Sequence, residues 1–180
     1  MAKKAWETGL IGRPEPGEIT LSPYDPAWPK TFEEQAKTIA GALGSTALRI
    51  EHIGSTAVPG LTAKPIIDIL VVVPDSADES MYLPQLEAVG YVLRVREPGW
   101  NEHRMFRTPA RDVHVHIYSS GCSEIERTLK FRDCLRGDAT QSNRYARTKR
   151  ELAARQWPDM DTYASAKSEV IEEILGKLQF

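Results

Sequence analysis

The stretch from Ile66 to Val73 constrains the fold of this 180-residue chain more than any other segment. Every position in it is apolar except Asp68, so an extended strand here has two apolar faces. A strand of this kind is covered on both sides and lies inside a sheet. Burying its carboxylate is costly unless the group is paired or bound to a cation. The sequence therefore predicts an interior strand whose Asp68 meets a metal ion, a basic side chain or backbone amides.

Alternation and helical spacing predict the elements around this strand. Strands are expected over residues 48–53, 91–96, 103–108 and 113–118, with a short edge strand over 19–21. Helices are expected from Asp25-Pro26 to Gly44 and over residues 78–89, with Pro84 limiting or splitting the latter. Three more are expected over residues 123–135, 138–156 and 159–177, opened by a Ser123/Glu126 capping box, Asp138 and Asp159.

This order of elements predicts one domain over residues 19–178, preceded by an extension over residues 1–18 that has no core of its own. The domain is expected to be α+β, in the sense of an α/β two-layer domain. It has a mixed β-sheet with helices packed on one side and a C-terminal helical segment.

Composition and charge exclude several classes of function. The formal net charge is −2, so no global basic field favours nucleic acid. No apolar run approaches the ~20 residues that cross a bilayer, and no apolar region typical of a secretory signal follows the N-terminal lysines. Cys122 and Cys134 lie on one expected helix, roughly 18 Å apart at the helical rise, and are not expected to pair. The sequence predicts a cytoplasmic protein with reduced thiols.

The loop over residues 54–65 has the composition of a phosphate cradle. Gly54 lets backbone approach a ligand, Ser55 and Thr56 offer hydroxyl donors, and Lys64 adds positive charge. No Gly-Lys-Ser/Thr triplet follows, so it is not a Walker A loop. The alternative is a plain connection between two strands.

A second group of polar residues lies on the last expected strand. Alternation puts Asp112, His114 and His116 on one face of it. Two imidazoles beside a carboxylate can form a metal site or a proton-transfer pair, and His52 can join them if its strand is a neighbour. Histidines on a solvated sheet face are the alternative.

Basic side chains form a third group. Arg104 shares its strand face with Phe106, whereas Arg107 lies on the other face, and both can recognise phosphate or carboxylate in a cleft. Tyr145 and Lys149 lie four residues apart on one helical face. Solvated surface positions are the alternative for all four residues.

Residues 51–69 closely resemble the signature of the GrpB family, and shorter matches occur at residues 24–29, 86–91, 114–116 and 131–136 and at Tyr145 with Lys149. The resemblance implies a fold similar to nucleotidyltransferases, in which a Gly-Ser pair holds a triphosphate and carboxylates hold Mg²⁺. Gly54 and Ser55 match the pair and Asp68 matches the first carboxylate. Leu70 stands at the second carboxylate position, and His114 and His116 stand where a later acid is expected. Family members fused to dephospho-coenzyme A kinase imply nucleotide-linked metabolism.

The leading hypothesis is a nucleotidyltransferase-type transferase or ATP-dependent ligase that uses a nucleoside triphosphate such as ATP, with Mg²⁺, to modify a small-molecule acceptor. Its catalytic and metal-binding residues are Asp68, His114 and His116. Its substrate-binding residues are Gly54, Ser55, Thr56, Lys64, Arg104, Arg107, Tyr145 and Lys149.

Two other hypotheses stay open. A catalytically degenerate module of the same fold would bind a nucleotide or metabolite without transferring a group, as Leu70 indicates. A metal-dependent hydrolase would use His52, His114 and His116. Neither nucleic acid nor a membrane is an expected partner, and the sequence does not predict the oligomeric state.

Overall fold

Strand β2 (Ile67–Val73) occupies an interior position in a five-stranded sheet, as the sequence predicts. The computed structural model describes residues 9–16 and 18–179. The strand order is β1-β2-β5-β4-β3, and the four other strands are β1 (Arg49–Ile53), β3 (Val92–Glu97), β4 (His103–Arg107) and β5 (Val113–Ser119). β2 and β5 pair in parallel, while the three other pairs are antiparallel. Apart from Asp68, every β2 side chain is buried.

Helices α1 (Trp28–Leu43) and α2 (Leu83–Ala88) cover one face of this sheet. The expected apolar face of α1 is confirmed, because Trp28, Ile39 and Leu43 are buried and Phe32 packs against the same core. Gly44 ends the helix at a φ of 54°, where glycine is favoured. The sheet contributes alternate residues of β2 and β5 to this core: Ile67, Ile69, Val71, Val73, Val113, Val115 and Ile117.

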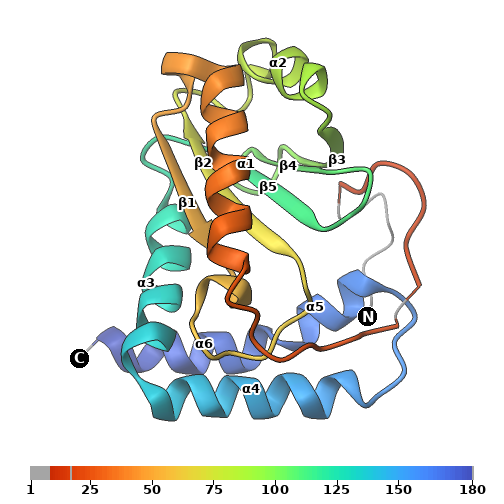
Figure 1. Cartoon of the computed structure of the whole chain (residues 1–180), viewed down its shortest axis with the longest axis vertical. Helices are drawn as coiled ribbons and strands as arrows, with labels where there is room; N and C mark the ends of the chain where they lie inside the picture. Colours follow the sequence, from red (N-terminus) through yellow and green to blue (C-terminus); the bar gives the residue numbers. More distant parts are fainter. Residues whose placement is uncertain (1–8, 17, 180) are drawn as a thin grey trace.

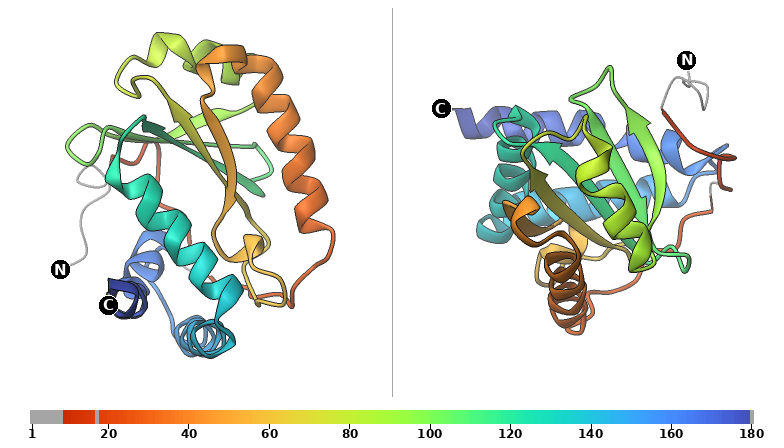
Figure 2. Two further views of the ribbon diagram at one scale, coloured as in Figure 1. Left: turned by 90° about the vertical axis from the view of Figure 1, so that its left-hand side faces the viewer. Right: turned by 90° about the horizontal axis from the view of Figure 1, so that it is seen from above.

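Helix α3 (Ser123–Gly137) covers part of the opposite face, so that the sheet lies between α1 and α3 (Figure 2). Helices α4 (Ala139–Ala153), α5 (Met160–Ala166) and α6 (Ser168–Gly176) cross one end of the sheet (Figure 1). Residues of α4, α6 and the end of α3 form a second core cluster with Val58 and Leu61 of the loop after β1. The predicted α+β class, with a mixed sheet and a C-terminal helical segment, is confirmed. The prediction that the helices pack on one side of the sheet is wrong, because α3 covers part of the face opposite α1.

Three boundary predictions near helix and strand starts are wrong. Helix α1 begins at Trp28, because Asp25 Oδ1 accepts a hydrogen bond from the Ala27 amide at 2.8 Å in the turn before the helix. Residues 19–21 form no strand, because the chain there pairs with the loop through an isolated Ser22–Ala63 bridge. Ser123 is already helical rather than a cap, since the extended backbone belongs to the preceding residue.

Other boundaries agree with the capping residues. Asp138 accepts hydrogen bonds from two amides at the start of α4, and Asp159 accepts one from Thr162 at the start of α5. Pro84 lies in the first turn of α2, with a separate 3₁₀ turn over Glu79–Met81 before it. The single helix expected over residues 159–177 is instead two helices, α5 and α6, that meet at Lys167. Both cysteines are free thiols, as expected.

The described part of the N-terminal extension, residues 9–16, runs along the edge of the sheet at β3. Leu10 forms an isolated bridge with Val95, and the Ile11 amide donates to the Arg94 carbonyl at 2.8 Å. The guanidinium of Arg94 donates in turn to the carbonyls of Ile11 and Arg13. We call residues 9–16 the N-terminal strap. No helix within the described residues combines the length and the apolar character needed to cross a membrane.

Candidate functional site

Asp68, His114 and His116 meet at the end of the sheet where β2 and β5 begin. The parallel register pairs Asp68 with His114 and Leu70 with His116, so the three polar side chains share the face opposite α1. Asp68 Oδ1 lies 3.2 Å from His116 Nε2 and 3.6 Å from His114 Nδ1. One potential ligand atom from each residue lies within 4.8 Å of the others. The structure therefore brings these three sequence-predicted residues into one cluster.

The surroundings favour the metal-binding forms of Asp68 and His114. Burial alone would raise the pKa of Asp68, but the hydrogen bond with His116 and the attraction of the nearby imidazoles and Lys167 lower it overall. Burial lowers the pKa of His114, against the opposing attraction of Asp68. Ionised carboxylate and neutral imidazole are the forms that bind a divalent cation. The donor set thus fits a single divalent metal ion.

A chain of hydrogen bonds behind His116 orients its ring. His103 Nδ1 lies 2.7 Å from Glu97 Oε2, and His103 Nε2 lies 3.1 Å from His116 Nδ1. An ionised Glu97 can only accept, so His103 Nδ1 donates, and a neutral His103 then accepts from His116 Nδ1–H. The other ring nitrogen, His116 Nε2, lies 3.2 Å from Asp68 Oδ1, at hydrogen-bonding distance. A second nitrogen held by a hydrogen bond is the way in which metal-binding histidines are oriented, so the chain fixes the His116 ring with Nε2 toward Asp68.

Gly54 leaves the space that the Asp68 carboxylate fills. Its φ is 72°, and a Cβ added there would lie 2.6 Å from Asp68 Oδ2. The next residue, Ser55, starts a 3₁₀ turn (Ser55–Ala57) and lines the cavity in front of Asp68. Burial raises the pKa of Tyr145 to about 12, and a hydrogen bond with Ser55 opposes that rise. Glycine at position 54 is thus explained by its contact with Asp68 as well as by its backbone conformation.

Three lysines face the cluster across a cavity of about 310 Å³, which we call the inner cavity. Lys64 comes from the loop before β2, Lys149 from α4, and Lys167 from the junction of α5 and α6. Burial lowers the pKa of all three, that of Lys149 to about 7. Among the described residues, no carboxylate lies within 4.0 Å of these ammonium groups. Partly desolvated cations with no carboxylate at ion-pair distance favour an anionic ligand.

Lys149 lines this cavity, and Tyr145 lies directly beside Lys149. The Lys149 ammonium donates to the Thr62 carbonyl and lies 4.9 Å from the centroid of the Tyr145 ring. Both side chains are buried, so the alternative that this pair lies on the solvated surface is wrong. The spacing of four residues brings them together, and packing of α4 against the loop buries them.

Arg104 and His52 lie outside this site, contrary to prediction. The Arg104 side chain is on the α1 face, where its Nε lies 2.6 Å from Glu79 Oε1. His52 is stacked on Phe32 of α1, with 4.8 Å between ring centroids. The strand alternation that turns Asp68 toward the site turns the residues of the α1 face away from it. A metal site of His52, His114 and His116 is therefore contradicted.

Thr56 and Asp112 make hydrogen bonds to nearby residues and not to the Asp68 cluster. The Thr56 hydroxyl donates to the Ile66 carbonyl at 3.0 Å and so must accept from His52 Nε2, also at 3.0 Å. Its side chain stabilises the loop although it borders the inner cavity. Asp112 Oδ1 accepts from the Thr108 hydroxyl at 2.6 Å in the turn before β5. Asp112 therefore belongs to the turn and not to the cluster.

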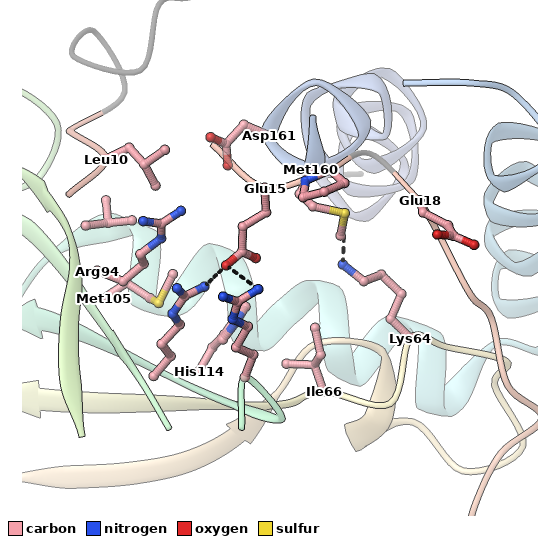
Figure 3. A pocket seen from close by; sticks show the side chains of 14 residues that line it. Leu10, Glu15, Glu18, Lys64, Ile66, Arg94, Met105, His114, Met160 and Asp161 are labelled. Carbon is pink, nitrogen blue, oxygen red and sulfur yellow. Dashed lines mark hydrogen bonds and ion pairs between the residues drawn. The ribbon is translucent and has the colours of Figure 1, made fainter. Parts of the chain in front are cut away.

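Arg107 lines a second cavity of about 350 Å³, which we call the outer cavity. Figure 3 shows this cavity from close by, with Glu15 and Arg94 labelled. The Arg107 guanidinium binds the carboxylate of Glu15 from the N-terminal strap, and Arg94 and Arg111 line the same space. The two cavities share six lining residues: Lys64, Ile66, Met105, His114, Met160 and Asp161. They are therefore two halves of one cleft between the sheet and α5.

Sequence reasoning missed several members of the site. Lys167 follows an ordinary helical pattern, and nothing local marks it as part of a cavity around Asp68. Glu97 and His103 belong to β3 and β4, and their role depends on strand pairing. Strand alternation could have indicated His103, because it places His103 on the same face of the strand as Arg107 and on the face opposite to Arg104.

These features define a class: a small α+β protein with an Asp-His-His cluster in a cleft that is also lined by lysines and arginines. The chain also matches the family model described as GrpB protein over residues 18–177, and it belongs to the GrpB family. A UPF0157 protein of Halalkalibacterium halodurans is 55% identical over 165 residues, which cover 92% of this chain and 85% of the relative. The predicted family is confirmed.

One solved structure of the family gives the same assignment. The crystal structure of the conserved protein GrpB from Enterococcus faecalis aligns with a TM-score of 0.77 and 36% identity, covering 89% of this chain and 100% of that one. A structure of Cid1 in complex with its short product ApU aligns with a TM-score of 0.47 and 14% identity, covering 71% of this chain and 43% of that one. We draw nothing further from a likeness that weak.

Proposed function

We propose that this protein binds a nucleoside triphosphate such as ATP together with a divalent metal ion and transfers part of it to a small-molecule acceptor. One observation carries the proposal: Asp68, His114 and His116 share the inner cavity with three lysines that have no acidic partner among the described residues. A polyphosphate with a bound cation matches both groups of residues, because the cation suits the Asp68 cluster and the phosphate oxygens suit the lysines. A ligand with neither a metal nor an anion would leave these groups uncompensated.

The metal would be held by Asp68, His114 and His116, where it would neutralise phosphate charge and polarise a phosphoryl oxygen. Two imidazoles with one carboxylate suit Mn²⁺, Fe²⁺, Co²⁺ or Zn²⁺ better than Mg²⁺, which prefers oxygen ligands. Leu70 is fully buried against α3, so it supplies no group for a second metal. The donor set supports a one-metal site in place of the Mg²⁺ site that the family resemblance implies.

The remaining residues would bind and orient the phosphates. Lys64 and Lys167 are half-buried at the rim and would contact phosphate oxygens directly. The Ser55 hydroxyl would donate from the turn beside Gly54. Lys149 already donates to a carbonyl, so it would add charge and hold the loop in place.

Calorimetric titration tests this proposal. ATP is titrated with Mn²⁺, Zn²⁺ or Mg²⁺ into the unmodified protein and into Lys167→Met, with Lys130→Met, an exposed lysine of α3, as the matched control. Lys167→Met is expected to weaken ATP binding roughly tenfold, because one charge-assisted hydrogen bond is lost. Lys130→Met is expected to have no effect, and Asp68→Asn is expected to abolish the dependence on metal. Absence of binding with all three metals would refute the proposal.

The buried Leu70 favours a second candidate, a module that binds the nucleotide without turning it over. The two candidates differ in products and not in affinity. Mass spectrometry of ATP incubated with the protein, metal and a panel of acceptors separates them. Released pyrophosphate or ADP, lost in Asp68→Asn, supports the transferase. Unchanged ATP despite tight binding supports the module.

A further inference from the structure

Glu15 of the N-terminal strap places its carboxylate among the arginines of the outer cavity (Figure 3). Its Oε1 accepts a hydrogen bond from Arg107 Nη1 and lies 3.1 Å from Arg111 Nη1. Arg107 is at the end of β4, and Arg111 belongs to the turn that leads into β5. Two guanidinium groups from separate positions thus converge on one carboxylate, an arrangement that recognises any carboxylate or phosphate of suitable size.

The strap is attached to β3 by polar contacts of residues 9–13. Leu10 bridges to Val95, and Arg94 binds two strap carbonyls. Residues 11–14 and 16 are exposed and belong to none of the hydrophobic core clusters. A segment with few buried apolar contacts opens at low free-energy cost. The Glu15 carboxylate can therefore leave the arginines without disturbing the core.

The arginines and the strap also differ in their relation to the family. The family model matches residues 18–177, so it includes Arg94, Arg107 and Arg111 but not Glu15. The basic half of the ion pairs lies inside the matched domain, and the acidic half lies in the extension before it. The arginines therefore belong to the matched domain itself, and Glu15 belongs to the segment before it.

We propose that the outer cavity is a subsite for an anionic group of the acceptor, a carboxylate or a phosphate, and that Glu15 competes with it for Arg107 and Arg111. The outer cavity opens into the inner one along shared residues that include Lys64 and His114. An acceptor anchored by its anion at the arginines extends toward the metal cluster. That the ligand is an acceptor rests on the proposed function, whereas the anion site does not.

Titration of small anions without metal or nucleotide tests the subsite. Succinate and inorganic phosphate are titrated calorimetrically into the unmodified protein, Glu15→Gln and Glu18→Gln. Glu18 is the matched control, because it lines the same cavity but makes no ion pair among the described residues. Glu15→Gln is expected to bind one or both anions roughly fivefold more tightly, because its competitor is removed. Glu18→Gln is expected to match the unmodified protein.

Removal of one arginine completes the test. Arg111 is exposed and has a φ of 63°, which asparagine tolerates, so Arg111→Asn is expected to fold and to lose the tighter binding seen in Glu15→Gln. Every titration is repeated with Lys167→Met added, which weakens phosphate binding at the inner lysines. The anion that responds to both Glu15→Gln and Arg111→Asn identifies the chemistry of the acceptor group.

Several results would overturn the subsite. These are no anion binding by Glu15→Gln, equal effects of Glu15→Gln and Glu18→Gln, or tighter binding that survives Arg111→Asn. Asp68→Asn disables the proposed metal centre and is expected to leave succinate binding unchanged. Failure of the metal–ATP titration and failure of the subsite are therefore separate results.

Discussion

At the scale of single residues, Gly54 connects the loop to the candidate metal cluster. A side chain at this position would collide with Asp68 Oδ2, and the backbone there has a positive φ. The second half of the loop contains Gly60, which has a φ of 79° and open space where a Cβ would stand. Both glycines have a left-handed backbone, but only Gly54 lies against Asp68. Substituting each of them in turn therefore distinguishes the effect of backbone strain from the effect of moving the Asp68 carboxylate.

Gly54→Ala is expected to lose about 1–3 kcal/mol of unfolding free energy and to weaken binding of Mn²⁺ or Zn²⁺ about tenfold. The stability loss follows from the strained φ and the collision, and the lost affinity follows from movement of Asp68. Gly60→Ala is expected to lose stability while keeping its metal affinity. Urea unfolding and calorimetric metal titration measure the two effects. Equal metal affinities in the two folded variants would contradict this assignment for Gly54.

At the scale of elements, the parallel pairing of β2 and β5 assembles the cluster. A shift of one residue in that pairing would turn His114 and His116 away from Asp68, because successive side chains alternate between faces. The antiparallel pairing of β4 with β5 then places His103 behind His116. Alternation in the sequence indicated which residues share a face on each strand. The neighbours of each strand and the register followed only from the sheet.

His103→Phe is expected to weaken metal binding about 10–100-fold while leaving all three proposed ligands in place. Phenylalanine keeps a ring at the position but cannot bond to His116 or Glu97, so the His116 ring loses its orientation. Tyr118→Phe is the matched control, since Tyr118 stacks on His103 with 4.9 Å between ring centroids and keeps its ring in the variant. Calorimetric titration of Mn²⁺ and Zn²⁺ measures the change. Unchanged affinity in a folded His103→Phe protein would rule out a positioning role.

At the scale of the whole molecule, the buried His52 links folding stability to pH. Burial lowers its pKa to about 4, with Arg136 and Arg132 adding to the effect and Asp68 opposing it. An unfolded chain has the ordinary histidine pKa of about 6.5, so below that pH the unfolded state binds the proton more readily. The contribution to stability is complete above pH 6.5 and is lost as the pH falls toward 4.

The unmodified protein is expected to lose about 2 kcal/mol of unfolding free energy through this histidine between pH 7.5 and pH 5. His52→Gln keeps a donor for Thr56 but does not titrate, so its loss over the same interval is expected to be smaller by that amount. Urea unfolding of both proteins at the two pH values gives the difference. Identical losses in the two proteins would show that His52 does not carry this dependence.

The sequence by itself determined the interior strand with its one acid, the Gly-Ser loop before it, the two histidines on one face and the family. These are local patterns, because alternation, apolar runs and turn residues act over a few positions along the chain. The tertiary structure alone decided that Asp68 lies beside His116, that Lys167 faces both residues, and that the Glu15 carboxylate pairs with two arginines. Each of these contacts joins residues far apart in sequence, and each depends on which strands pair, in what register, and how helices close the end of the sheet. Arg104 and His52 were misassigned for the same reason, since a strand's alternation does not say which face will become the cleft.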